Sequence, residues 1–221
     1  NRLPILLLPG DTFANRFPDP VLQQVEHFNR PSETQNDSFK AVSKYFDRIT
    51  RPEQILSSLP QAIQLMLDQA DCGPATISIS QDVQGEAFDY PEVFFKEQVH
   101  EIRRVYPDQN QIIKVVEVIK KSKQPIIISG GGVLYSEAEK ELSAFAKKHN
   151  IPVTPTIMGI GCMDRDDPYN IGPIGGLGVG SANSLSKDTD LAIAVGTKLG
   201  DFTTGSWTNF QNPDFKLVSI N

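Results

Sequence analysis

The chain has 221 residues, a formal net charge of −6 and 39% hydrophobic residues. This length suits one large or two small domains, and the composition is that of a globular chain with a packed core. The acidic balance without a basic block argues against a nucleic-acid partner, and the apolar run Leu6–Leu8 is too short to span a membrane.

The two cysteines, Cys72 and Cys162, lie far apart and have no metal-ligand spacing. So few thiols favour a reducing cytoplasm, and we expect both to be buried and unreactive. The chain begins within two residues of a predicted strand and stops on another. We therefore expect a piece of a longer polypeptide.

The first half starts with a strand over Leu3–Leu8, and Pro9–Asp11 is the turn that ends it. Gly10 and Asp11 could form a ligand-binding turn, but a simple loop is favoured. Val21–Phe28 has the pattern of a short helix. Alternation of apolar and polar residues predicts a strand over Ala75–Ser80.

A helix is predicted to start at Thr50, with Pro52 near its first position and Glu53 as the acid of a capping box. Pro60 should split or kink this helix because it lacks a backbone donor. The helical spacing makes one apolar face that we assign to the core: Ile55, Leu56, Leu59, Ile63, Met66 and Leu67.

The stretch 86–106 is a linker that packs over a surface, since a structureless segment of this length is uncommon inside a compact domain. After it, Asp108 can cap a helix. The apolar residues of that helix are expected to face the core: Ile112, Ile113, Val116 and Ile119.

The stretch Gln124–Leu134 organises the second half. Its isoleucines Ile126–Ile128 predict a strand buried on both faces, and three glycines follow at once. Ser136 and Glu139 have the spacing of a capping box for a helix that runs to His149. Strand, glycines and helix fit a nucleotide crevice, or a tight turn that only packs helix on strand, and both stay open.

Further strands are predicted over Ile151–Thr156, Leu191–Val195 and Lys216–Ile220. Three aspartates in the loop Asp164–Pro168 could hold a metal, but a solvated loop is favoured because the calcium-loop pattern is missing. The stretch Gly172–Gly180 is the most glycine-rich and precedes a short helix.

Strands that alternate with helices predict an α/β fold with a doubly wound parallel sheet, Rossmann-like, preceded by part of a second α/β domain. Glycine loops follow three of the strands, at the sheet edge where ligands of such folds bind. The candidate nucleotide-binding residues are therefore Gly130, Gly131, Gly132, Met158, Gly159, Gly196, Thr197 and Lys198.

Two parts of the chain resemble thiamine diphosphate enzymes of the acetolactate synthase type. Gly73–Gln84 resembles the end of their pyrimidine-binding domain. Their central domain is similar to Gln124–Tyr135, Ile151–Gly161, Gly172–Gly178 and Leu191–Gly205. The resemblance divides the chain into the end of a pyrimidine-binding domain (1–85), a linker (86–106) and a central domain (107–221).

Three shorter segments resemble a branch of this family that opens a cyclic 1,2-dione in inositol breakdown: Leu8–Ala14, Ala70–Thr76 and Asp201–Trp207. The resemblance implies hydrolysis of a carbon–carbon bond in a small-molecule substrate, with thiamine diphosphate and Mg²⁺ as cofactors. It also implies a homodimer or homotetramer in the cytoplasm, without a membrane or nucleic-acid partner.

The sequence departs from the family pattern at the catalytic positions. The family's activating glutamate and its Gly-Asp-Gly magnesium motif have no match, since Gly10-Asp11 is followed by Thr12 and Gly200-Asp201 by Phe202. We therefore assign no catalytic or metal-binding residue and expect no cofactor on this piece alone. An acetolactate synthase-like lyase and a non-catalytic nucleotide-binding module are the alternatives.

Overall fold

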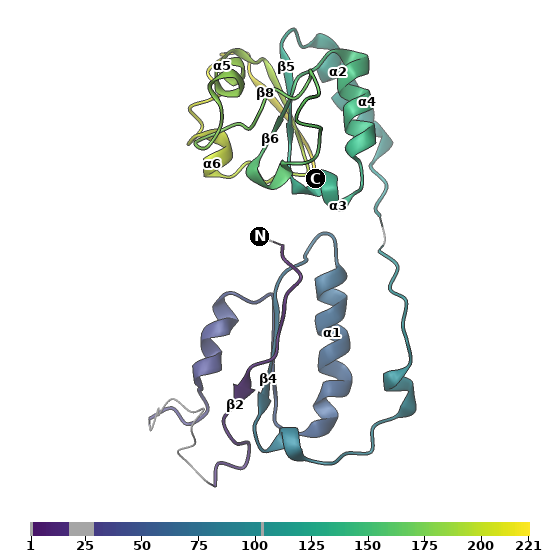
Figure 1. The fold of residues 1–221 in the computed structure, drawn as a ribbon, viewed down its shortest axis with the longest axis vertical. Helices are drawn as coiled ribbons and strands as arrows, with labels where there is room; N and C mark the ends of the chain where they lie inside the picture. Colours follow the sequence, from purple (N-terminus) through teal and green to yellow (C-terminus); the bar gives the residue numbers. More distant parts are fainter. Residues whose placement is uncertain (1, 18–28, 103) are drawn as a thin grey trace. The chain divides into compact units, whose positions relative to one another are not determined.

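The computed structural model describes residues 2–17, 29–102 and 104–221 in two compact units (Figure 1). Unit 1 is Asn1–Tyr106 and unit 2 is Pro107–Asn221. The short helix predicted over Val21–Phe28 lies outside the described residues.

Unit 1 is built on a parallel sheet whose central strand is β4 (Ala75–Ser80), with the predicted bounds. Strands β1 (Leu6–Leu7) and β2 (Gly10–Asp11) pair with one side of β4, and β3 (Tyr45–Ile49) pairs with the other. Within the described residues of the unit, the helices are α1 (Ile55–Leu67) and the 3-10 helices η1 (Gln35–Ala41), η2 (Pro52–Gln54), η3 (Val83–Gly85) and η4 (Glu92–Phe95).

The first strand starts and ends later than the predicted Leu3–Leu8, because β1 and β2 are two parts of one extended segment from Leu6 to Asp11. Both pair with β4 in the same register, Leu6 opposite Ala75 and Gly10 opposite Ile79. Pro9 interrupts the ladder between them because it has no N–H to donate. The turn predicted at Pro9–Asp11 is therefore wrong.

Helix α1 packs on β4 and β3 through the expected face, which includes Ile55, Leu59 and Met66. The predicted split at Pro60 is wrong: α1 runs through it without a break. Because Pro60 has no N–H, the carbonyl group one turn before it in the helix has no backbone partner. Pro60 is exposed, so water can bond to this carbonyl group instead.

The predicted capping box at the start of this helix is also wrong. Gln54 takes the place of Glu53, since its Oε1 accepts from the backbone N of Thr50 (2.7 Å) and of Arg51 (3.0 Å).

Unit 2 holds a four-stranded parallel sheet in the order β6-β5-β7-β8, as expected for a doubly wound fold. Its strands are β5 (Pro125–Ser129), β6 (Val153–Pro155), β7 (Leu191–Val195) and β8 (Lys216–Ile220). Its helices are α2 (Gln109–Lys121), α3 (Gly131–Tyr135), α4 (Glu139–His149), α5 (Gly180–Asp188), α6 (Asp201–Thr204) and the 3-10 helix η5 (Ile157–Gly159).

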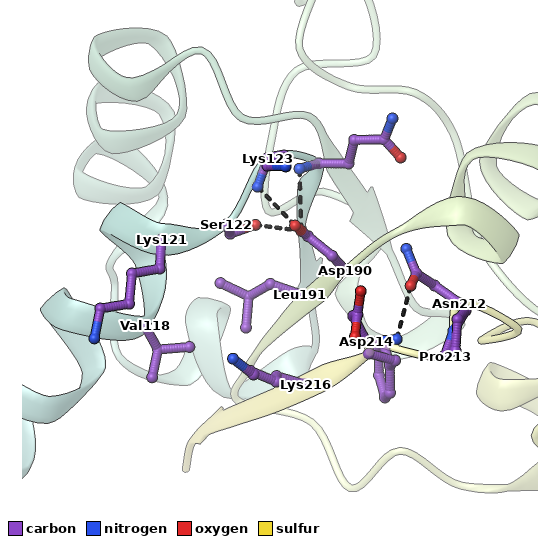
Figure 2. Close-up of a pocket in the computed structure, with 12 residues that line it drawn as sticks. Val118, Lys121, Ser122, Lys123, Asp190, Leu191, Asn212, Pro213, Asp214 and Lys216 are labelled. Atoms are coloured by element: carbon purple, nitrogen blue, oxygen red, sulfur yellow. Dashed lines mark hydrogen bonds between the residues drawn. The ribbon is translucent and has the colours of Figure 1, made fainter.

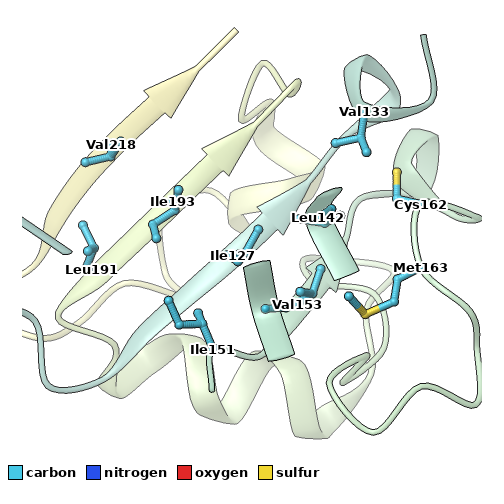
Figure 3. Packing of buried hydrophobic residues seen from close by; sticks show 11 residues of the cluster. Ile127, Val133, Leu142, Ile151, Val153, Cys162, Met163, Leu191, Ile193 and Val218 are labelled. Atoms are coloured by element: carbon cyan, nitrogen blue, oxygen red, sulfur yellow. The ribbon is translucent and has the colours of Figure 1, made fainter. Parts of the chain in front are cut away.

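The strand β5 is buried on both faces, which confirms the prediction from its isoleucines. Ile127 belongs to the main core of the unit, together with Leu142 of α4 and Ile193 of β7 (Figure 3). Ile126 and Ile128 point to a second apolar cluster on the opposite face of the sheet.

The helix α2 begins as predicted, with Asp108 Oδ1 accepting from Gln111 N (3.0 Å). Its predicted core face is only partly right. The residues that pack on the main core are Val115, Val118 and Ile119, whereas Ile112, Ile113 and Val116 are exposed. The apolar residues of this helix cover a wider arc than the core does, so their spacing alone does not tell which side is buried.

The glycine triplet does not form a loop before a long helix. Gly131 and Gly132 are themselves the first residues of α3, and Ser136 ends this helix instead of capping the next one. The chain turns at Glu137, whose φ is 53°, and α4 then starts after Ala138. The predicted Ser136–Glu139 capping box is therefore wrong.

Candidate functional site

The predicted glycine residues meet at the carboxyl-terminal edge of the unit 2 sheet. Gly130 N donates to Val195 O (2.8 Å) and Gly132 N donates to Gly196 O (3.0 Å). A Cβ atom added to Gly132 would lie 2.6 Å from Gly196 Cα. The ends of β5 and β7 thus touch through their own backbones.

The other predicted residues lie around this contact. Gly159 is buried, and an added Cβ would lie 2.8 Å from the carbonyl carbon of Ser129. An added Cβ on Gly131 would lie 3.1 Å from Met158 O. The Met158 side chain and Lys198 are exposed. Ligand binding by these residues stays a prediction.

A buried charge network that no sequence pattern indicated lies at the carboxyl-terminal edge of the unit 1 sheet. Asp11, at the end of β2, is 1% exposed. Its Oδ2 accepts from Arg48 Nε (2.7 Å) and Ser78 Oγ (2.6 Å), and its Oδ1 accepts from Thr12 N (2.8 Å). Arg48 lies on β3 and Ser78 on β4, so one carboxylate ties the three strand ends together.

The start of η1 closes over this network. Arg48 Nη2 donates to Thr34 Oγ1 (3.0 Å) and pairs with Asp37 Oδ1 (3.0 Å). Asn36 Nδ2 donates to Gly10 O (2.7 Å) and to Ser78 Oγ (2.8 Å). Lys40 adds a second cation beside Asp37, at 2.7 Å.

The pKa values of the network follow from these contacts. Burial alone would raise the pKa of Asp11, but the bonds from Ser78 and Arg48 outweigh it and leave the pKa lowered. Burial also opposes the ionisation of Asp37, yet bonds from Lys40, Thr34 N and Arg48 lower its pKa to about 2. Both carboxylates are therefore ionised at neutral pH and paired, which is how a folded protein tolerates buried charge.

The acidic loop after β6 uses its carboxylates within the fold. Asp167 Oδ2 pairs with Lys147 Nζ (2.8 Å) on α4, and Asp164 Oδ1 accepts from Asp166 N (3.1 Å). Within the described residues, no group of three or more His, Cys, Asp or Glu side chains could hold a metal ion.

A hollow of about 620 Å³ opens at the opposite, amino-terminal edge of the unit 2 sheet (Figure 2). Asp190 at its wall accepts from Ser122 Oγ, Lys123 N (2.7 Å) and Gln124 N (3.0 Å). Burial alone would raise the pKa of Asp190, but these bonds leave it lowered. Asp190 thus holds the turn before β5 onto the start of β7, and its oxygens are used by the protein.

The two thiols are not reactive groups. Cys162 is fully buried and donates to Gly130 O (3.3 Å), whereas Cys72 is only partly buried and donates to Met66 O (3.2 Å). Burial raises the pKa of both thiols, which keeps them protonated at neutral pH. The expected burial is therefore confirmed for Cys162 only.

Comparison with known proteins shows what this chain is similar to. Residues 112–221, which make up most of unit 2, match the family model for the thiamine pyrophosphate enzyme, central domain. The parallel sheet of unit 2 is consistent with the Rossmann-like fold of that domain, which the sequence predicted.

Curated relatives extend the match to the whole chain. The chain is 51% identical to the 3D-(3,5/4)-trihydroxycyclohexane-1,2-dione hydrolase of Clostridium tetani, strain Massachusetts / E88. It is 49% identical to the enzyme of that name from Clostridium botulinum, strain Alaska E43, and 48% identical to hydrolase 1 of Bacillus cereus, strain ZK / E33L. Each match covers 100% of this chain and 34% of the relative, so the chain spans about a third of their length.

Thiamine pyrophosphate, which is thiamine diphosphate, carries a diphosphate group, and the resemblance seen in the sequence implies Mg²⁺ as its partner. The described residues do not fit that group. Asp11, the acid of the first Gly-Asp pair, is buried with both oxygens bonded. Asp201, the acid of the second, accepts from Ser206 Oγ (2.7 Å) within its own turn. Asp201 is exposed, but one carboxylate does not supply the set of oxygens that magnesium takes.

None of the described helices has the length and apolarity needed to cross a membrane.

Proposed function

We propose that this chain is part of a thiamine diphosphate-dependent hydrolase that cleaves a carbon–carbon bond of a cyclic 1,2-dione, trihydroxycyclohexanedione, in inositol catabolism. The observation that carries the proposal is the identity of 48% to 51% over all 221 residues to relatives named for that reaction. Such identity runs through both units. It therefore includes residues 1–111, which lie outside the match to the central-domain family.

The role of this chain in the enzyme is to supply parts of two domains. Residues 1–85 form the end of the pyrimidine-binding domain, 86–106 the linker, and 107–221 the central domain. The match of the central-domain family to residues 112–221 supports the last of these assignments. The enzyme works in the cytoplasm as a homodimer or homotetramer with Mg²⁺, and the catalytic residues lie outside this chain.

The complete gene product should be assayed with thiamine diphosphate and Mg²⁺ on two substrates. Hydrolysis of trihydroxycyclohexanedione without turnover of pyruvate is the expected result. Turnover of pyruvate without action on the dione would contradict the proposal and assign the chain to an acetolactate synthase-like enzyme.

The 221-residue chain alone should not bind the cofactor, because its Gly-Asp carboxylates are used within the fold. Calorimetric titration with thiamine diphosphate and Mg²⁺ measures this directly. A dissociation constant in the micromolar range would show that the chain holds a cofactor site and would contradict the assignment of the site to other parts of the enzyme.

A further inference from the structure

The strand order of unit 2 places a switch point between β5 and β7. The chain leaves β5 toward β6 on one side and later returns to β7 on the other. In doubly wound folds the loops after two such strands diverge, and the crevice between them takes a nucleotide or another phosphate-bearing ligand. The fold therefore implies a nucleotide at this point, and its residues can be tested for fit.

The two loops at this switch point do not leave a crevice. The hydrogen-bond ladder of the sheet continues past the strand ends through Gly130 N to Val195 O (2.8 Å) and Gly196 N to Ile220 O (2.8 Å). The first turn of α3 then bonds to the loop after β7, with Gly132 N donating to Gly196 O (3.0 Å). Backbone therefore fills the space that a phosphate group would need.

The glycines are required for this contact on both sides. A Cβ atom on Gly130 would lie 2.6 Å from Thr197 Cβ, and one on Gly196 would lie 2.6 Å from Gly132 Cα. Gly196 also has a φ of 59°, a conformation that favours glycine. The absence of side chains here serves close backbone packing, which is the second of the two readings that the sequence left open.

Two of the amide groups at the glycine turn are already used within the fold. Gly130 N donates to Val195 O at the end of β7, and Gly132 N donates to Gly196 O in the loop after it. The carbonyl group of Gly130 is also used, since it accepts from Cys162 Sγ (3.3 Å). The helix that starts here, α3, has five residues. So short a helix sums few peptide dipoles and attracts an anion weakly.

We propose that Gly130, Gly132 and Gly196 form a glycine joint that closes the β5–β7 switch point, so that no nucleotide phosphate binds between these strands. The joint locks the two central strands of the sheet at their carboxyl ends. This inference is independent of the proposed hydrolase activity, which needs thiamine diphosphate and not a nucleotide in unit 2.

The nucleotide side of the proposal is tested on the 221-residue chain by calorimetric titration with ADP, NAD⁺ and FAD, each to millimolar concentration. No saturable binding is expected. Lys198 is an exposed cation on the loop after β7, and a glutamate in its place would repel a phosphate bound there. Such repulsion weakens binding by about tenfold. Nucleotide binding that weakens by about tenfold or more in Lys198→Glu would therefore overturn the proposal. Binding unchanged in Lys198→Glu would place the nucleotide elsewhere and leave the joint closed.

The packing side is tested by alanine substitution and thermal unfolding followed by the fluorescence of Trp207. Gly132→Ala should lower Tm by about 10 °C or more, because its Cβ meets backbone that cannot move aside. Gly180→Ala is the matched control: Gly180 starts α5, and an added Cβ meets nothing within 4 Å. Equal Tm values for the two variants would overturn the joint.

Discussion

The central strands of the two units are paired in parallel on both sides, yet their surroundings differ. In unit 1, β4 buries Thr76, Ser78 and Ser80, and a carboxylate–guanidinium network holds its carboxyl end. In unit 2, β5 buries three isoleucines between apolar clusters on both faces. In unit 1, apolar packing of Ile77 with residues of α1 on one face of β4 is thus combined with directed polar contacts, whereas β5 of unit 2 has apolar packing on both faces.

The difference has a physical consequence. The stability that comes from apolar packing depends on side-chain volume and changes little with pH. A buried ion pair stabilises the fold only while both partners are present and charged. The two units should therefore fail under different changes. The single tryptophan, Trp207, lies in unit 2, so its fluorescence reports that unit while circular dichroism reports both.

The largest loss of stability is expected in unit 2. Ile127→Ala should destabilise unit 2 by about 4 kcal/mol, because it leaves a cavity at a residue that is 1% exposed. Denaturant unfolding followed by Trp207 fluorescence measures the loss. The same change at Ile113, which is 57% exposed on α2, should cost less than about 0.5 kcal/mol. Similar losses in the two variants would contradict the packing assigned to β5.

A somewhat smaller loss of stability is expected in unit 1. Arg48→Ala should destabilise unit 1 by about 3 kcal/mol, because it leaves Asp11 buried without its cation; Arg48 itself is 22% exposed, which reduces the loss from that of a fully buried pair. The circular dichroism transition should shift while the Trp207 transition stays in place. Arg51→Ala removes a cation that is 74% exposed and should change neither.

Acid should next weaken unit 1 more than unit 2, in which the pKa of Asp190 is also lowered. The pKa of Asp37 is about 2 in the folded unit against an ordinary value of 3.8, so its protonation favours the unfolded chain. Its contribution is complete above about pH 4 and is lost as the pH falls toward 2. Asp11, whose pKa is also lowered, acts in the same direction. Denaturant midpoints measured from pH 6 to pH 2.5 should fall in unit 1, and an unchanged circular dichroism transition would contradict the network.

The smallest effect concerns the start of unit 2. Asp108→Ala should cost about 1 kcal/mol, because it removes the side chain that accepts from Gln111 N at the first turn of α2. Asp108→Asn keeps an acceptor at this position and should cost only a few tenths of a kcal/mol. Equal losses in the two variants, measured by Trp207 fluorescence, would show that the cap does not act through its hydrogen bond.

The sequence predicted the strands of unit 2 well because its signals are local. Runs such as Ile126–Ile128 favour burial, and β5 contains this run with one further residue at each end. The strands β7 and β8 have the predicted bounds. The same reasoning missed β3 in unit 1, where Asp47 and Arg48 interrupt the apolar pattern. The partner of Arg48 is Asp11, 37 residues away, and no local pattern contains that pairing.

The candidate sites show the same limit. The glycines of unit 2 were correctly placed at one sheet edge, but their spacing could not tell a ligand crevice from a backbone contact. That distinction depends on whether two loops diverge, which is set by residues far apart in the chain. In unit 1 the sequence favours a simple loop at Gly10-Asp11, where the structure has the strand β2. The signal available in the sequence for the charge network was Asp11, an acid close to the apolar run Leu6–Leu8.

Residue-resolved amide hydrogen exchange at pH 7, in the unaltered chain and in Arg48→Ala, tests most directly whether the two sheets are stabilised separately. The β4 amides of Ile77 and Ile79 should lose about 100-fold of their protection in the variant, the equivalent of about 3 kcal/mol. The β5 amides of Ile127 and Ile128 should keep theirs. Equal loss in both strands, or no loss in β4, would contradict the account.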